Sequence, residues 1–143
     1  MEKPEKRITD FIKKHHVLTL ATSQKNLPWC ANCFYAYLES ENAFVFTSEP
    51  ITKHIQESIE QPIVAGSVVL ETSVVGKIQG IQFTGKLIKA EADLLKIARG
   101  RYLKRFPFAA LMETTLWVLY LDYIKMTDNQ LGFGKKLIWK ALD

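Results

Sequence analysis

The sequence predicts a mainly β domain in which six short strands form an antiparallel barrel with added helices. Two observations support this fold class. The strand-like runs are short, closely spaced and separated by turn-forming residues, as in all-β barrels. Segments with helical character precede the first strand, follow the third and precede the last. The chain of 143 residues is long enough for one such domain, residues 1–143, and too short for two ordinary ones.

The composition indicates a compact globular protein. Hydrophobic residues make up 48% and charged residues 24%, which excludes disordered and low-complexity classes. The charged stretch Met1–Arg7 is not followed by an apolar signal region, so we expect a cytoplasmic protein without membrane association. The net charge of +4 comes from scattered residues, which suits an anionic small ligand and does not indicate nucleic acid.

The first half of the chain predicts a helix followed by three strands. Ile8, Phe11 and Ile12 recur at helical spacing, and this helix ends near His15 and His16. The sequence then predicts a strand at 17–22, a polar turn at 23–27, a strand at 28–38, a turn at 39–42 and a strand at 43–47. Because these strands are sequential and closely spaced, we expect them to pair as an antiparallel meander.

Cys30 and Cys33 form a C-x-x-C motif, which in other contexts indicates a redox centre or a zinc site. The surrounding residues are aromatic and apolar without helical spacing, so they predict a strand, where positions three apart point to opposite faces. Zinc also needs more than two ligands, and the histidines lie on other elements at no metal-like spacing. We therefore predict two reduced, mostly buried thiols and no metal site.

The stretch 43–54 predicts a strand that leads directly into the start of a helix. Its apolar run is followed by three hydroxyl groups, a proline turn and a lysine, at Thr47, Ser48, Thr52, Pro50 and Lys53. Free backbone N–H groups and the positive end of the helix dipole suit an anion at such a junction, and phosphate is the first candidate. In the alternative interpretation, Thr52 caps the helix and Lys53 is a solvated charge.

The second half predicts three more strands and a long helix. After a helix from about 52 to 59, we expect strands at 63–70 and 78–88, a helix at 92–106 with one further turn at 108–112, and a strand at 115–125. Gly80 and Gly85 interrupt the strand at 78–88, and glycine there usually marks a bulge, a barrel corner or the close approach of a ligand. Gln79 and Gln82 flank Gly80 and either face solvent or contact that ligand.

The last predicted strand has apolar residues on both faces. This pattern implies burial inside a barrel and under a helix, or against another subunit. The following tail, 127–139, ends in Trp139, which is too apolar for a free tail and is expected to dock onto the body or a partner chain.

Two runs of residues carry a family resemblance. Val-Phe-Thr-Ser at 45–48 and Ile-Thr-Lys at 51–53 are similar to the Phe-Tyr-Thr-Asn and Ser-Arg-Lys runs of pyridoxamine 5′-phosphate oxidase. The ending Ile-Lys-Met-Thr-Asp-Asn-Gln-Leu-Gly-Phe-Gly-Lys-Lys-Leu-Ile-Trp, at 124–139, resembles the uncharacterised bacterial YhbP branch of the related split-barrel flavoproteins. The resemblance covers nearly the whole chain and implies the FMN-binding split-barrel fold.

The resemblance also implies an FMN-binding homodimer with each flavin at the subunit interface. Three groups of cofactor-binding residues follow from it: Phe46, Thr47, Ser48, Thr52 and Lys53 at the phosphate, Asn32, Gln79, Gly80 and Gln82 around the ring, and Thr127 and Asn129 from the other chain. The strand at 31–36 falls where the family lays its backbone along the flavin ring. A flavin carries the redox chemistry itself, which agrees with the absence of a nucleophile or an acid–base dyad in the sequence.

Two departures from the oxidase limit what the resemblance implies. Ala31 stands where the oxidase has an arginine for the FMN phosphate, and Ala36 where it has a lysine for the substrate phosphate. The arginine and histidine that engage the vitamin ring have no clear equivalents in 131–136. We therefore expect a flavin-dependent oxidoreductase of unknown substrate, and not a pyridoxamine-phosphate oxidase; whether it is an enzyme is left open.

Two alternatives remain at this point. The lost cations favour a cofactor-free dimeric split barrel that has kept the fold without the pocket. Some split barrels bind haem, and His15, His16 and His54 are available as ligands.

Overall fold

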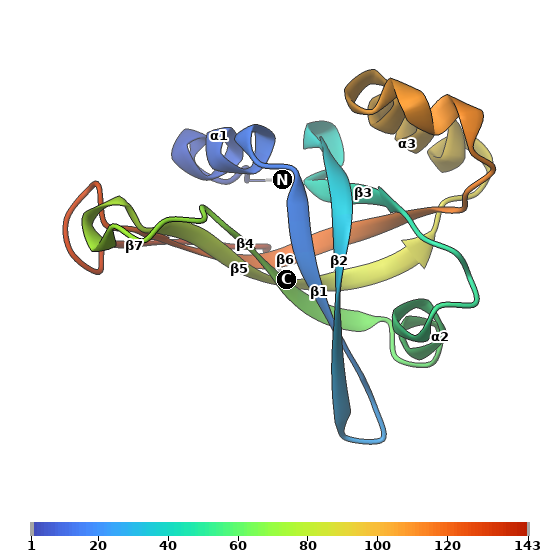
Figure 1. Cartoon of the computed structure of the whole chain (residues 1–143), viewed down its shortest axis with the longest axis horizontal. Coiled ribbons are helices and arrows are strands. Elements are labelled where there is room, and N and C mark those ends of the chain that lie inside the picture. Colours follow the sequence, from blue (N-terminus) through green and yellow to red (C-terminus); the bar gives the residue numbers. More distant parts are fainter. Residues whose placement is uncertain (1, 143) are drawn as a thin grey trace.

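Figure 1 shows the computed structural model, which describes residues 2–142 as a curved sheet with α1 and α3 above it and α2 at the lower right. The elements in chain order are α1 (Lys6–Lys14), β1 (Val17–Gln24), β2 (Leu27–Leu38), the 3₁₀ turn η1 (Glu39–Glu41), β3 (Ala43–Thr47), α2 (Lys53–Glu60), β4 (Ile63–Val69), the 3₁₀ turn η2 (Val75–Lys77), β5 (Gln79–Lys89), α3 (Ala92–Arg105), the 3₁₀ segment η3 (Pro107–Leu111), β6 (Leu116–Asp128) and β7 (Lys136–Lys140).

The described strands form one antiparallel sheet in the order β3-β2-β1-β4-β5-β6-β7, and a further pairing of β3 with β6 closes the first six into a barrel. The predicted mainly β barrel of six strands is confirmed, and the sheet has a seventh strand that was not predicted. The additional strand, β7, pairs with the end of β6 in a segment that the sequence predicts as a tail. A lysine at each end of β7 is typical of edge strands, since charge there discourages further pairing.

The barrel interior is filled by large side chains from most strands. Tyr35, Phe44 and Phe83 are fully buried or nearly so, and the Phe44 ring lies 4.8 Å from the Tyr35 ring and 4.9 Å from the Phe83 ring. Such tilted aromatic pairs add to the apolar area that stabilises the barrel. Opposite Gly85, the register between β5 and β6 shifts, which confirms a bulge at this glycine.

Helix α3 covers part of the outside of the barrel. A second apolar cluster joins Ala98 and Tyr102 of α3 to Ala36 of β2, Val45 of β3 and Val118 of β6. The alternate residues of β6 belong to the interior cluster. The predicted two-sided burial of this strand is therefore confirmed, and both sides are covered within one chain.

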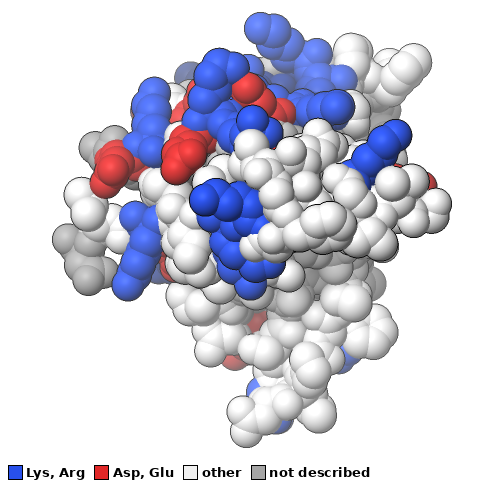
Figure 2. Space-filling view, turned by 90° about the vertical axis from the view of Figure 1, so that its left-hand side faces the viewer, with Lys and Arg blue, Asp and Glu red and all other residues white. Residues whose placement is uncertain are grey.

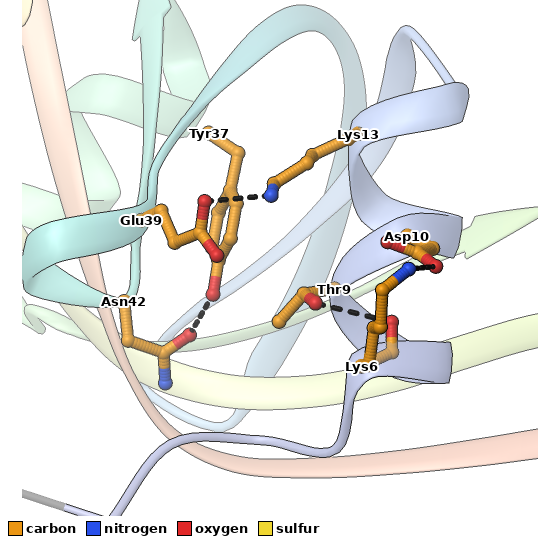
Figure 3. A network of polar contacts seen from close by, with 7 residues as sticks. All are labelled: Lys6, Thr9, Asp10, Lys13, Tyr37, Glu39 and Asn42. Carbon is orange, nitrogen blue, oxygen red and sulfur yellow. Dashed lines mark hydrogen bonds and ion pairs between the residues drawn. The ribbon is translucent and has the colours of Figure 1, made fainter.

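Helix α1 is fastened to the barrel by polar contacts. Figure 3 shows the Lys13 ammonium paired with Glu39 at 2.6 Å and the buried Tyr37 hydroxyl donating to the Asn42 amide oxygen at 2.5 Å. Burial raises the pKa of Tyr37 above its ordinary value, so this hydroxyl stays protonated.

Arg105 of α3 binds the carbonyl oxygens of Tyr35 at 3.0 Å and Lys13 at 3.1 Å, and also that of His15. These bonds satisfy carbonyls at the end of α1 and join it to α3.

The C-terminal segment is also attached to the body. Trp139 is buried on the interior side of β7, and its indole N–H donates to the Glu2 carbonyl at 2.9 Å. This is one of the two places predicted for Trp139. No helix within residues 2–142 has the length and apolar character needed to cross a membrane.

Candidate functional site

The junction between β3 and α2 gathers the predicted phosphate-binding hydroxyls. Ser48 Oγ lies 2.6 Å from His54 Nε2 and 3.5 Å from Thr52 Oγ1. The Thr52 side chain makes no capping hydrogen bond to α2 and instead donates to the Glu49 carbonyl at 2.9 Å. The first-turn N–H groups of α2 therefore lack the side-chain acceptor that an N-cap residue normally supplies.

His54 belongs to this junction, although sequence reasoning did not assign it there. Burial lowers the pKa of His54 below its ordinary value, so the imidazole is neutral at pH 7. Thr47, in contrast, points to the α3 side, where its hydroxyl lies 3.3 Å from that of Tyr102. Phe46 is fully buried in the barrel and contributes packing. The predicted phosphate-binding residues therefore do not all lie together. Ser48, Thr52 and the backbone of Lys53 lie at the junction, whereas the side chains of Thr47 and Phe46 do not.

The Lys53 side chain extends from α2 toward β2. Its ammonium is 2.8 Å from the buried carboxylate of Glu57 and 5.3 Å from the centre of the Trp29 ring. Hydrogen bonds from Lys53 and Thr22 hold the pKa of Glu57 below its ordinary value, so this carboxylate is charged. The contact with Trp29 brings the start of α2 close to β2, three residues before Asn32.

Strand β2 has an unpaired edge beside this junction. It pairs with β1 over Leu27–Phe34, but its pairing with β3 begins only at Tyr35. Alternate residues of 27–34 therefore direct backbone N–H and C=O groups away from β1, with no strand of residues 2–142 to receive them. This edge includes the start of the 31–36 stretch along which the family resemblance places the flavin ring.

Asn32 and Gln82, two of the predicted ring residues, lie in one row across the sheet. The strand registers align Asn32 with Thr19, Thr19 with Ser67, and Ser67 with Gln82. All four side chains are on the outside of the barrel, and the Thr19 hydroxyl donates to the Asn32 amide oxygen at 2.9 Å. A hollow of about 510 Å³ lies over Thr19, Ser67 and Gln82 of this row and is also lined by Lys125. Sequence reasoning missed Thr19 and Ser67, for which only strand register supplies a signal.

The other predicted residues lie at the far end of the sheet. Gly80 pairs with Thr127, Gln79 donates to the buried Asp128 carboxylate at 3.1 Å, and Asn129 donates to the Val75 carbonyl at 2.8 Å. Leu116 of β6 is paired with Thr47, and Thr127 lies eleven residues further along β6. At about 3.3 Å per residue, this separation is up to roughly 36 Å. Within one chain, the far-end residues and the junction do not form a single site.

The cysteines and histidines do not form a metal centre. Cys30 and Cys33 lie on opposite faces of β2, as predicted, but the predicted burial of both thiols is wrong for Cys30, which is exposed because its face points outward. Cys33 is buried, and burial raises its pKa to about 11. His15 packs on Phe11 and His16 on Phe106, whereas His54 lies at the β3–α2 junction. Within residues 2–142, no group of three or more His, Cys, Asp or Glu residues is arranged to hold a metal ion.

Sequence comparison identifies the family. A UPF0306 protein of Photorhabdus laumondii is 44% identical over 130 residues, which span 91% of each chain. The UPF0306 protein YhbP of Escherichia fergusonii is 42% identical over 132 residues, which span 92% of this chain and 90% of that protein. The chain belongs to the UPF0306 family. This agrees with the resemblance to the YhbP branch, and no family model matches the chain.

Structural comparison supports the split-barrel fold of this UPF0306 protein. A haem-binding protein from Mycobacterium smegmatis superposes with a TM-score of 0.73 at 20% identity, covering 87% of this chain and 52% of that protein. An FAD-binding protein from Mesorhizobium loti superposes with a TM-score of 0.69 at 16% sequence identity, covering 84% of this chain and 91% of that protein. HutZ, a haem storage protein from Vibrio cholerae, superposes with a TM-score of 0.69 at 16% sequence identity, covering 85% of this chain and 92% of that protein. At these identities the likeness establishes the fold alone.

Proposed function

We propose that this UPF0306 protein binds FMN, with the phosphate at the β3–α2 junction and the flavin ring along the unpaired edge of β2. One observation carries the proposal: the uncapped first turn of α2 lies beside that edge, joined to it by the Lys53–Trp29 contact. A helix start with free N–H groups suits a phosphate, and an open strand edge suits the hydrogen-bonding rim of a flavin.

The residues present fit this group in kind. Ser48 and Thr52 supply hydroxyls, and Lys53 supplies a cation on a flexible side chain that is 56% exposed and can exchange Glu57 for a phosphate. Glu57 competes with a phosphate for the Lys53 ammonium, which weakens phosphate binding. Ala31 and Ala36 add no positive charge to offset this loss. We therefore expect binding that depends strongly on the one remaining lysine.

A bound flavin would supply electron transfer, and the residues of this chain would bind and orient it. Asn32 presents its amide on the outer side of β2, beside the unpaired edge. Such an arrangement supports a flavin-dependent oxidoreductase of unknown substrate. The FAD-binding neighbour supports a flavin in this fold.

The test compares Lys53→Ala with Lys96→Ala, which removes an exposed cation of α3. We expect Lys53→Ala to weaken FMN binding at least tenfold and to leave the affinity for riboflavin, which lacks the phosphate, unchanged. Lys96→Ala should alter neither. Equal FMN affinity in wild type and Lys53→Ala, measured by flavin fluorescence titration of folded protein, would refute the phosphate assignment.

Haem binding is the second candidate function, because two of the structural neighbours are haem proteins. His16 is the histidine best placed for it, since it is exposed and lies beside Phe106, whose ring is 5.8 Å from the 60% exposed Phe34. A Soret band that forms on adding haemin and shifts in His16→Ala would favour this candidate. The same band in both proteins would exclude His16 as the ligand.

A further inference from the structure

The β3–α2 junction places one histidine between two hydroxyl groups. His54 is the second residue of α2, and its Nε2 atom lies 2.6 Å from Ser48 Oγ and 3.4 Å from Thr52 Oγ1. Its ring is partly exposed, and its side chain makes no other hydrogen bond within residues 2–142. The Ser48 carbonyl accepts from the Trp117 indole of β6 at 2.9 Å, which fixes the backbone that carries this hydroxyl. The imidazole is thus engaged by the same hydroxyls that the proposed phosphate site uses.

The protonation state of His54 determines the direction of its hydrogen bond with Ser48. In the neutral ring one nitrogen is a donor and the other an acceptor, so Nε2 can accept the Ser48 hydroxyl hydrogen. In the charged ring both nitrogens are donors. Nε2 then donates to Ser48 Oγ, and the hydroxyl hydrogen of Ser48 turns away from the ring. In this orientation it can donate to an oxygen of a bound phosphate.

The elements around His54 leave its charge to be decided by a ligand. Strands β1, β2 and β3 contain no charged residue. On α2 and in the loop before it, Lys53 is paired with Glu57 at 2.8 Å, and Glu49 and Glu60 are exposed. Burial lowers the pKa of His54, and none of these charges contributes to the shift. A phosphate beside the ring would therefore act on it without opposition from a fixed charge.

The cations on the α1 side of the molecule lie away from the junction. Figure 2 shows lysine and arginine side chains of that side gathered mostly in the upper part of the molecule, whereas α2 lies low on the opposite side in Figure 1. They are not placed to serve a phosphate bound beside α2. At the junction itself, Lys53 supplies the ammonium, and His54 is the group that can gain a second positive charge.

We propose that His54 is the second cation of the phosphate site, which takes up one proton from solvent when the phosphate binds and then holds the Ser48 hydroxyl in its donating orientation. This inference rests on the proposed function, because it assumes that the FMN phosphate lies at the junction. A phosphate dianion bound by Ser48 Oγ lies within about 4–6 Å of the imidazole, and an opposite charge at that distance favours the charged form of histidine. Phosphate binding and protonation of His54 therefore strengthen each other.

The first experiment follows the three histidines by NMR through a pH titration of the wild-type protein, with and without FMN. Bound FMN should move the titration curve of His54 to higher pH. Riboflavin, which lacks the phosphate, should not move it in this direction. The other two histidines serve as internal controls, because their rings pack on Phe11 and Phe106 outside the junction, and their curves should stay in place.

The second experiment compares the FMN affinity of wild type and His54→Gln at about pH 8 and about pH 5.5. Glutamine keeps an amide that can bond to Ser48 but cannot take up a proton. The phosphate of FMN itself titrates near pH 6, and this affects both proteins equally, so the ratio of their dissociation constants isolates His54. Wild type should gain on His54→Gln by about fivefold or more as the pH falls, since the group with the raised pKa in the complex binds its proton there. A merely structural role would change affinity by the same factor at both pH values.

The outcomes separate this inference from the proposed function. If FMN binds, but the His54 titration curve stays in place or the affinity ratio is the same at both pH values, the flavin site stands and the role of His54 is overturned. If wild type binds no FMN at either pH, the proposed function fails and this inference fails with it. A His54 curve that riboflavin moves as far as FMN does would also overturn the inference, because the phosphate would not be its cause.

Discussion

Glu57 illustrates how one residue connects the barrel to the candidate site. Its carboxylate is 3% exposed and binds the Thr22 hydroxyl at 2.7 Å and the Lys53 ammonium at 2.8 Å. The same residue therefore joins α2 to β1 and determines where the Lys53 side chain points. A phosphate at the junction must compete with Glu57 for Lys53.

The lowered pKa of Glu57 predicts how its contribution to stability depends on pH. As pH falls, the unfolded chain takes up the proton first, so the stabilisation is complete above the unfolded pKa of about 4.3 and is lost as pH falls through the lower folded pKa. The difference in Tm between wild type and Glu57→Gln should be largest near pH 7 and should shrink as pH falls below the unfolded pKa of about 4.3. Glu60→Gln, an exposed control on the same helix, should show no such trend, and a constant difference for Glu57→Gln would contradict the assignment.

Part of this site could be predicted from the sequence. The hydroxyls of Ser48 and Thr52 and the start of α2 follow from local composition, and the spacing of Lys53 and Glu57 is that of a helical ion pair. Thr22 and Trp29 could not be predicted as neighbours of α2, because they reach it through barrel closure. His54 carried no signal beyond its position next to Lys53.

At the scale of elements, the sheet depends on glycine where strands approach closely. A Cβ at Gly85 would overlap the Tyr120 carbonyl oxygen and a methyl group of Leu119, beside the β-bulge. Gly100, in the middle of α3, has open space around its Cα. The two glycines therefore differ in what alanine would do.

Gly85→Ala should lower the free energy of unfolding by about 2 kcal/mol or more, since overpacking forces the backbone of β6 to move. Gly100→Ala should raise it by about 0.5–1 kcal/mol, because alanine is the better helix former. Urea denaturation of both variants measures the difference. A Gly85→Ala variant as stable as wild type would show that the bulge adjusts freely.

Most elements could be predicted, because turn residues separate short periodic runs and the structure follows them closely. β7 could not be, since it has lysines at both ends and follows Gly132 and Gly134, a composition typical of a tail. Helix α3 touches the barrel mainly through Ala98 and Tyr102, and Leu95 on the same helix is 38% exposed.

At the scale of the whole molecule, the residues predicted to bind one cofactor lie at two opposite ends of the barrel. Within one chain, Thr127 and Asn129 lie at the far end of β6 from the β3–α2 junction. Sequence periodicity does not identify the row Asn32–Thr19–Ser67–Gln82, because this row exists only once four strands are in register.

The most direct measurement of the central proposal is the visible absorption spectrum of the purified protein after incubation with FMN and exhaustive dialysis. FMN binding at the junction predicts that flavin bands remain with the protein, at no more than one flavin per chain, and that incubation with riboflavin leaves weaker bands. A protein that is colourless after incubation with either ligand and subsequent dialysis would contradict the flavin site and favour a cofactor-free barrel.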